Sequence, residues 1–186
     1  MDSINTERRV LLLNDGIDDD TLGLVAAAFE EFKGRDCRII MNSGGGQVTQ
    51  GLGIIDLIHL YPGKVTIDVY GCAESMAAVI LQAADVRRMA PSSFLMIHQG
   101  IEEPEADSKR NIKSYLKVSD KQDDICDALV LRRIQKKHPK YSWSQFREAT
   151  HHNIYFTAEQ ALEWGLIDGI LGTRQPRLTA KKRKNR

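Results

Sequence analysis

Three short segments of the sequence carry the residue types that acyl transfer requires. Residues 42–46 read Asn-Ser-Gly-Gly-Gly, and the backbone N–H groups of such a glycine run can closely approach a bound chain or an anion. Ser75 stands between a strand-like and a helix-like run, where a hydroxyl lies beside the positive end of a helix dipole. His98 closes an apolar run and is a candidate general base. Together these segments supply oxyanion donors, a nucleophile and a base.

Each segment also has a plain structural interpretation. The glycine run can be a strand-to-helix turn, Ser75 can be only the N-cap of its helix, and His98 can be a structural histidine at a strand end. No Lys-Ser or Lys-Thr pair follows the glycines, so they do not form a Walker loop, and their spacing is not G-x-G-x-x-G. The acyl-transfer hypothesis therefore depends on the combination of all three segments.

Alternating strand-like and helix-like segments must position these residues. Strands separated by single helices are typical of βαβ units with right-handed crossovers, so the expected fold class is α/β with a mostly parallel sheet. The predicted strands are Arg9–Asn14, Cys37–Asn42, Val65–Gly71, Phe94–Gln99 and Leu166–Leu171. The predicted shorter helices are Asp19–Lys33, Gln47–Tyr61, Ser75–Ala84, Ser142–Thr150 and Ala158–Trp164.

One long helix is predicted over Asp107–His138, ending just before Pro139. A helix of about 30 residues extends about 45 Å, which is further than a small domain needs. We therefore expect it to pack partly on another subunit. The alternative is two shorter helices with a kink near residues 119–120.

Composition and charge narrow the function classes. The 186 residues suit a single domain over residues 1–173, followed by a basic tail over residues 174–186. The tail holds seven basic and no acidic residues, so the remaining 19 basic and 25 acidic residues leave the body at about −6. The tail is either a disordered solubilising segment or a patch for nucleic acid or another acidic partner. The acidic body argues against nucleic acid as the main substrate.

The location expected from the sequence is the cytoplasm. Three cysteines cannot all pair, and no C-x-x-C spacing indicates a metal or redox site, which suits free thiols in a reducing compartment. The first residues contain no apolar region of signal-peptide length, and no run approaches the length of a membrane span. Neither secretion nor membrane insertion is expected.

Four ordered blocks resemble the proteolytic subunit of the Clp protease, ClpP. Residues 42–51 are similar to that family's N-S-P-G-G-x-V-x-x-G stretch, and residues 71–78 to its G-x-A-A-S-M-G/A nucleophile segment. Residues 88–99 resemble R-x-x-P-N-S…M-I-H-Q, and residues 155–168 resemble F-[LM]-[ST]-A-x-E-A…Y-G-L-[IV]-D. The similarity runs from about Arg9 to Gly172 at near-family spacing.

The resemblance implies a serine peptidase of the ClpP/crotonase-type α/β fold, built of repeated βαβ units with a protruding handle helix. It places Ser75 on the family nucleophile and His98 on its base. It also assigns the oxyanion hole to the backbone N–H groups of Gly46 and Met76. No metal and no cofactor are implied.

Two positions of the site depart from the family pattern. Asn153 falls where the family has the third triad residue, an aspartate, and an asparagine can orient an imidazole without supplying charge. A weakened or conditional enzyme is therefore expected, and Asp168 is a conceivable substitute although it matches a separate family aspartate. In the substrate-binding loop of Gly44 and Gly45, Gly44 replaces the family proline, which loosens the loop.

The partners that the resemblance implies are a peptide or unfolded protein substrate and further copies of the chain, stacked as rings that enclose the active sites. Only residues 1–8 precede the first predicted strand, so docking of an AAA+ unfoldase through the family's usual N-terminal segment is doubtful.

Three other functions compete with this interpretation. The first is a weak or inactive ring subunit that acts as a scaffold or modulator, which Asn153 and the short N-terminal segment favour. The second is an acyl-CoA enzyme of the related crotonase fold, which the Ser-Met and Met-Ile-His-Gln pair disfavours. The third is a maturation protease of a viral particle, which a compact chain with a basic tail would suit.

Overall fold

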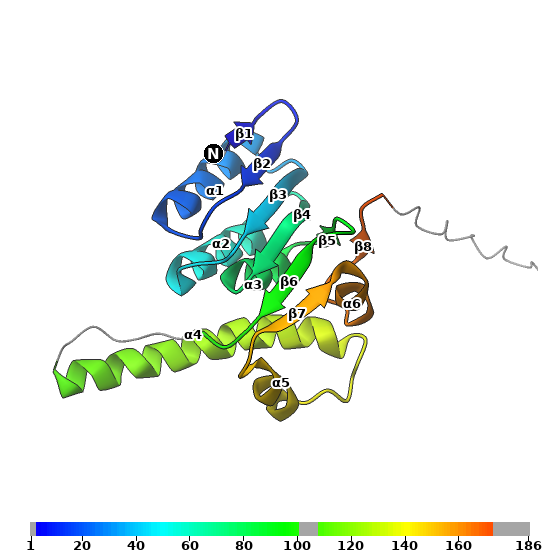
Figure 1. The fold of residues 1–186 in the computed structure, drawn as a ribbon. Coiled ribbons are helices and arrows are strands. Elements are labelled where there is room, and N and C mark those ends of the chain that lie inside the picture. The colour runs from blue at the N-terminus through cyan, green and yellow to red at the C-terminus, as the bar shows by residue number, and fades with distance from the viewer. Residues whose placement is uncertain (1–2, 101–107, 173–186) are drawn as a thin grey trace, which may run out of the picture.

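The computed structural model describes residues 3–100 and 108–172 and shows one mixed sheet with helices packed against it (Figure 1). The start of the predicted long helix at Asp107 and the basic tail lie outside these residues. The strands are β1 (Ser3–Asn5), β2 (Val10–Leu13), β3 (Cys37–Ser43), β4 (Val65–Glu74), β5 (Val86–Met89), β6 (Phe94–Ile97), β7 (Ile154–Thr157) and β8 (Gly169–Ile170). The helices are α1 (Asp19–Phe32), α2 (Val48–Leu60), α3 (Met76–Ala83), α4 (Lys109–Gln135), α5 (Trp143–Thr150) and α6 (Ala158–Glu163).

The sheet has a parallel centre. β2, β3, β4 and β5 are parallel neighbours in that order, β8 extends the sheet beyond β5, and β1 pairs with β2 in the antiparallel direction. β6 leaves this path and pairs in parallel with β4, and β7 pairs antiparallel with β6. The expected α/β class with a mostly parallel sheet is confirmed, whereas β1, β5 and β7 lie outside the predicted strands.

β4 is the strand that divides the sheet, because its first half pairs with β5 and its second half pairs with β6. Gly71 lies between the halves with a φ of +82°, and a Cβ at this position would collide with the Asn42 side chain. That side chain accepts the backbone N–H of Cys72 at 3.1 Å and so holds the bend. β4 therefore continues to Glu74, past its predicted end, and stops directly before Ser75.

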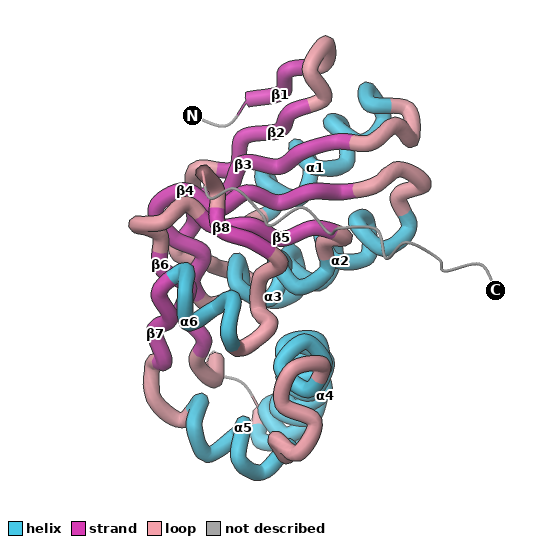
Figure 2. Tube along the Cα trace, turned by 90° about the vertical axis from the view of Figure 1, so that its right-hand side faces the viewer, coloured by secondary structure: helices cyan, strands magenta, loops and turns pink. Residues whose placement is uncertain are grey.

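α3 is the central helix of the core. All eight of its residues are buried, which is the pattern of a helix that is surrounded by protein on every side. α1, α2 and α3 lie on one side of the sheet (Figure 2), and α3 contacts both α2 and α4. Because α3 begins at Met76, the core fixes the position of the residue that precedes it.

α4 is a single helix of 27 residues, about 40 Å long, so the alternative of two shorter helices is wrong. Its C-terminal half packs on the core through Val130, Leu131 and Ile134, while its N-terminal half projects away from the body (Figure 1). The Ser108 side chain caps its start by accepting the N–H of Asn111 at 3.3 Å. In the described part of the chain, no helix combines the length and the apolar character needed to cross a membrane.

Candidate active site

Ser75 occupies the sharp turn between β4 and α3. Its φ of 53° and ψ of −124° define a conformation that residues other than glycine rarely adopt. Its backbone N–H donates to the carbonyl oxygen of Met96 on β6 at 2.9 Å, which ties the turn to the neighbouring strand. Ser75 stands at the N-cap position of α3, but its side chain caps no backbone group. The interpretation of Ser75 as a helix cap is therefore wrong, and its hydroxyl is directed elsewhere.

The hydroxyl of Ser75 meets the ring of His98. His98 directly follows β6, which runs parallel to the end of β4, so the residues that follow the two strands come together at the same edge of the sheet. Ser75 Oγ and His98 Nε2 lie 2.8 Å apart, within hydrogen-bond distance. When the other ring nitrogen carries the proton, Nε2 accepts the hydroxyl hydrogen and can remove it.

The glycine loop between β3 and α2 lies against the Ser75 turn. Gly45 has a φ of +92°, and a Cβ at this position would lie 2.8 Å from Ser75 Cβ and 2.9 Å from Met76 N. Ile17 anchors the loop, because its N–H donates to Gly45 O at 2.9 Å and its carbonyl accepts the Gln47 N–H at 2.8 Å. The absence of a side chain at Gly45 therefore lets the loop touch the turn.

Two backbone N–H donors near the Ser75 turn have no protein acceptor among the described residues. Among the described residues, no acceptor takes the N–H of Gly46 in the loop or of Met76 at the first position of α3. Gly46 is itself held against Ile17, whose backbone a Cβ at this position would overlap. By contrast, Gly44 has open space around it. Free N–H groups beside a nucleophile can stabilise an oxyanion.

Asn153 makes no hydrogen bond to the imidazole in the described part of the chain. The antiparallel pairing of β6 with β7 sets Ile97 opposite Ile154, so the same register carried one residue further puts Asn153 across from His98. Its side chain is exposed, and within residues 3–100 and 108–172 no hydrogen bond joins it to the His98 ring. The role of Asn153 in orienting His98 stays a prediction.

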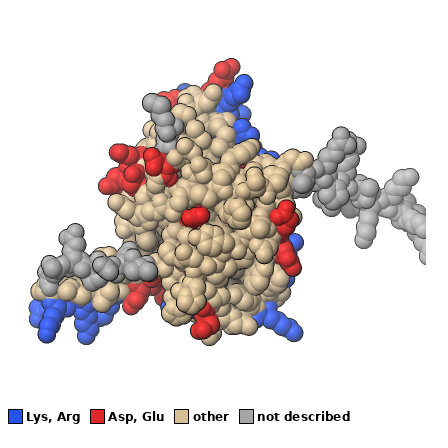
Figure 3. All heavy atoms as spheres, in the orientation of Figure 1, with Lys and Arg blue, Asp and Glu red and all other residues tan. Residues whose placement is uncertain are grey.

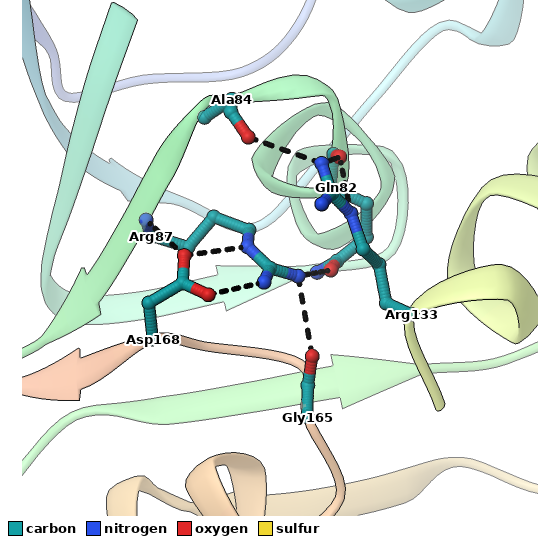
Figure 4. Close-up of polar contacts among 6 residues, drawn as sticks. All are labelled: Gln82, Ala84, Arg87, Arg133, Gly165 and Asp168. Atoms are coloured by element: carbon teal, nitrogen blue, oxygen red, sulfur yellow. Dashed lines mark hydrogen bonds and ion pairs between the residues drawn. The ribbon is translucent and has the colours of Figure 1, made fainter. Parts of the chain in front are cut away.

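Asp168 does not substitute for the missing aspartate. Both of its carboxylate oxygens bind Arg87, at 2.6 Å from Nη2 and at 3.0 Å from Nε (Figure 4). The Arg87 guanidinium also donates to Gln82 Oε1 and to Gly165 O. Arg133 of α4 adds two hydrogen bonds to Gln82 O at the end of α3. This network therefore joins the end of α3 to β5, to α4 and to the segment before β8.

Neutralising Asp168 is expected to destabilise the fold in a pH-dependent way. Burial raises the pKa of Asp168, but the hydrogen bonds and charge of Arg87 outweigh burial and leave the pKa below its ordinary value. The contribution of the ionised Asp168 carboxylate to the free energy of unfolding is therefore complete above the unfolded pKa of about 3.9. It is lost as the pH falls through the lower pKa of the folded state. Because the Asp168 side chain is 42% exposed, we expect Asp168→Asn to cost about 1–2 kcal/mol at pH 7.

Urea unfolding followed by circular dichroism checks this expectation between pH 7 and pH 3. The difference in free energy of unfolding between wild type and Asp168→Asn should become smaller as the pH drops below about 3.9. Glu163→Gln is the matched control, since Glu163 is exposed and makes no ion pair with any described residue. A difference of constant size at every pH would contradict the assigned role of the carboxylate.

A cavity of about 230 Å³ opens beside the hydroxyl and the imidazole. One side of it is formed by the catalytic candidates and by apolar residues, and the other side by α4 and Arg147. The α4 residues are Asp120, Asp123, Cys126, Asp127 and Val130. Sequence reasoning missed these carboxylates, although their spacing of three and four residues places them on one face of the predicted helix. Among the described residues, no three His, Cys, Asp or Glu side chains are grouped so that they could hold a metal ion.

Comparison with protein families agrees with the fold and the site. The family model described as Clp protease matches residues 2–174 of the chain, which covers both segments of the hydrogen-bonded pair and the glycine loop. Membership indicates a serine peptidase, and proteins of this family generally form oligomeric rings and act on peptides. The expected ClpP-type fold is confirmed. With most of its length covered by this match, the chain belongs to the Clp protease family.

Proposed function

We propose that the chain hydrolyses peptide bonds with Ser75 as the nucleophile and His98 as the general base. The observation that carries this proposal is the 2.8 Å separation between Ser75 Oγ and His98 Nε2. As Oγ attacks the carbonyl carbon of the substrate, Nε2 takes the hydroxyl proton, and the carbonyl oxygen becomes an oxyanion. Collapse of this intermediate breaks the C–N bond, and the leaving amine receives the proton from His98. Water then attacks the acyl-enzyme by the same route and releases Ser75.

Gly46 and Met76 are the proposed donors to the oxyanion. Their N–H groups lack acceptors among the described residues, and Gly45 holds the loop against the Ser75 turn. A donor of this kind contributes about 10²–10³ in kcat when it is aimed at the developing charge.

A fluorophosphonate probe tests the assignment of the nucleophile without a known substrate. An activated serine should be labelled, and mass spectrometry of the digested protein should place the adduct on Ser75. His98→Gln should slow labelling strongly because the base is lost, whereas Ser142→Ala, a change in the cap of α5, should leave the labelling rate unchanged. A label on another serine, or no label at all on folded protein, would overturn the proposal.

The position of Asn153 leads to a gain-of-function prediction. An aspartate there would stabilise the imidazolium that forms as Ser75 loses its proton, so Asn153→Asp is expected to raise kcat/KM by about tenfold or more. Steady-state rates on a short fluorogenic peptide measure this gain.

His152→Asp is the matched control, because it adds the same charge one residue away from the position across from His98. An equal gain from both variants would show a general electrostatic effect and would remove Asn153 from the site. The lack of a hydrogen bond between the side chains of Asn153 and His98 also favours a second candidate function, a ring subunit with little activity. That candidate would be supported if Ser75 resisted the probe in folded protein.

We propose that copies of the chain assemble through α4 and enclose the active sites. α4 carries large apolar side chains that are 44–56% exposed, namely Tyr115, Leu116 and Val118 in its projecting half and Ile125 just beyond it. Much of the face seen in Figure 3 also lacks charged side chains. Exposed apolar surface of this kind marks interfaces. Ile125→Glu together with Leu129→Glu should therefore reduce the particle mass in light scattering, and a strictly monomeric wild type would contradict the assembly.

A further inference from the structure

The cavity beside Ser75 is lined by both apolar and charged side chains. Val48, Val79 and Val130 supply apolar walls next to the hydroxyl, while three aspartates of α4 supply carboxylates. A volume of about 230 Å³ corresponds to seven or eight waters at about 30 Å³ each, which suits one long side chain. Because Ser75 and His98 lie on the wall, the group that enters belongs to the substrate residue next to the scissile bond.

The carboxylates of the cavity outnumber its cation. Asp120, Asp123 and Asp127 line it, and Arg147 is the one Lys or Arg among the lining residues of this part of the chain. Arg147 is shared, because its Nε binds Asp127 Oδ2 at 3.1 Å while its Nη2 binds Asp124 Oδ1 at 2.7 Å, and Asp124 is not a lining residue. The guanidinium therefore cannot neutralise the cavity.

Burial raises the pKa of two groups in the wall, and neighbouring carboxylates add to the effect. Burial, together with the charges of Asp123 and Asp127, raises the pKa of the Cys126 thiol to about 12. Asp127 is only 8% exposed, and burial raises its pKa despite the opposing effect of Arg147. The added effect of the two aspartates on Cys126 indicates that carboxylate charge acts at this wall.

We infer that this cavity selects a lysine or arginine on the amino side of the scissile bond. The inference rests on the proposed function and names the substrate class of the same site. The methylene stem of such a side chain packs between Val48, Val79 and Val130, and the terminal cation lies at the carboxylates of Asp120 and Asp127. An acidic side chain is excluded by like-charge repulsion.

Matched fluorogenic peptides that differ only at this residue test the inference. The wild-type protein should cleave the lysine peptide with a kcat/KM about tenfold or more above that of the norleucine peptide, which keeps the stem without the charge; tenfold is about 1.4 kcal/mol. The glutamate peptide should be the poorest. The preference should shrink between 0.05 and 0.5 M NaCl, because salt screens the cavity charges.

Charge-removing variants locate the source of the preference. Asp127→Asn combined with Asp120→Asn should bring the lysine-to-norleucine ratio of kcat/KM close to one. Asp120→Asn alone, at an exposed position that does not threaten folding, should lower the ratio partly. Asp124→Asn is the matched control, since Asp124 also binds Arg147 but does not line the cavity, and its ratio should equal that of wild type.

The outcomes separate this inference from the proposed function. Cleavage that depends on Ser75 but favours norleucine over lysine would overturn the inference and leave the serine mechanism in place. A lysine preference that survives in the double variant would also overturn it, because the aspartates would not be its source. If folded protein cleaved no peptide and took up no probe at Ser75, the proposed function would be refuted, and the inference with it.

Discussion

Replacing Ser75 with alanine is expected to lower kcat/KM for peptide hydrolysis by at least about 10⁴-fold, because the acyl-enzyme cannot form without the hydroxyl. The fold should persist, since Ser75 Oγ is hydrogen-bonded to His98 alone among the described residues and the backbone hydrogen bond to Met96 does not involve the side chain. Peptide hydrolysis, with circular dichroism to monitor folding, measures both properties.

Ser142→Ala is the control for this experiment. It removes a hydroxyl that caps α5 and is expected to cost about 1 kcal/mol of stability without changing turnover. Wild-type turnover in Ser75→Ala would refute the serine mechanism, and a fall of similar size in Ser142→Ala would show that the loss reflects folding.

Gly45→Ala should have the second largest effect, a loss of about 10³-fold or more in kcat/KM. An alanine there would be strained at a φ of +92°, and its methyl group would press on Ser75 Cβ and Met76 N. The loop must then retreat from the turn, which displaces the Gly46 N–H and leaves the oxyanion with fewer donors. The loss of one donor costs about 10²–10³ in kcat, and misplacement of the substrate chain adds to it.

Gly44→Ala provides the matched comparison one residue earlier. A Cβ at Gly44 meets nothing within 4 Å, so this variant should keep activity within about threefold of wild type and gain slightly in stability. Steady-state kinetics and thermal unfolding of the two variants distinguish an effect of the contact with the Ser75 turn from an effect of loop flexibility. Equal losses in both variants would show that loop flexibility, rather than contact with the Ser75 turn, limits catalysis.

The parts of the fold that were predictable are those with a local signal. β3 and β4 begin at the predicted residues, because both are rich in β-branched and apolar residues and each follows a polar or glycine-containing turn. The junction at Ser75 was predictable for the same reason, since a strand-like run passes there into an apolar helix. The meeting of Ser75 with His98 followed from the resemblance and from the parallel arrangement of their strands.

The parts that could not be predicted depend on residues far apart in the sequence. β5 reads Val-Arg-Arg-Met, which has no strand signature, and its buried Arg87 pairs with Asp168, 81 residues later. Likewise, the helical spacing of the aspartates of α4 is visible in the sequence. Which face of α4 turns toward His98 is decided by the packing of Val130 and Ile134 on the core.

Because the backbone of Ser75 is strained, selection for thermal stability and selection for hydrolysis favour different residues at position 75. Its φ of 53° carries a conformational cost of about 1–3 kcal/mol, which a glycine at this position would relieve. A library of variants screened only for heat resistance should therefore accumulate glycine at position 75. A library screened for hydrolysis cannot follow that route, so the two screens should diverge at this residue before they diverge elsewhere in the core.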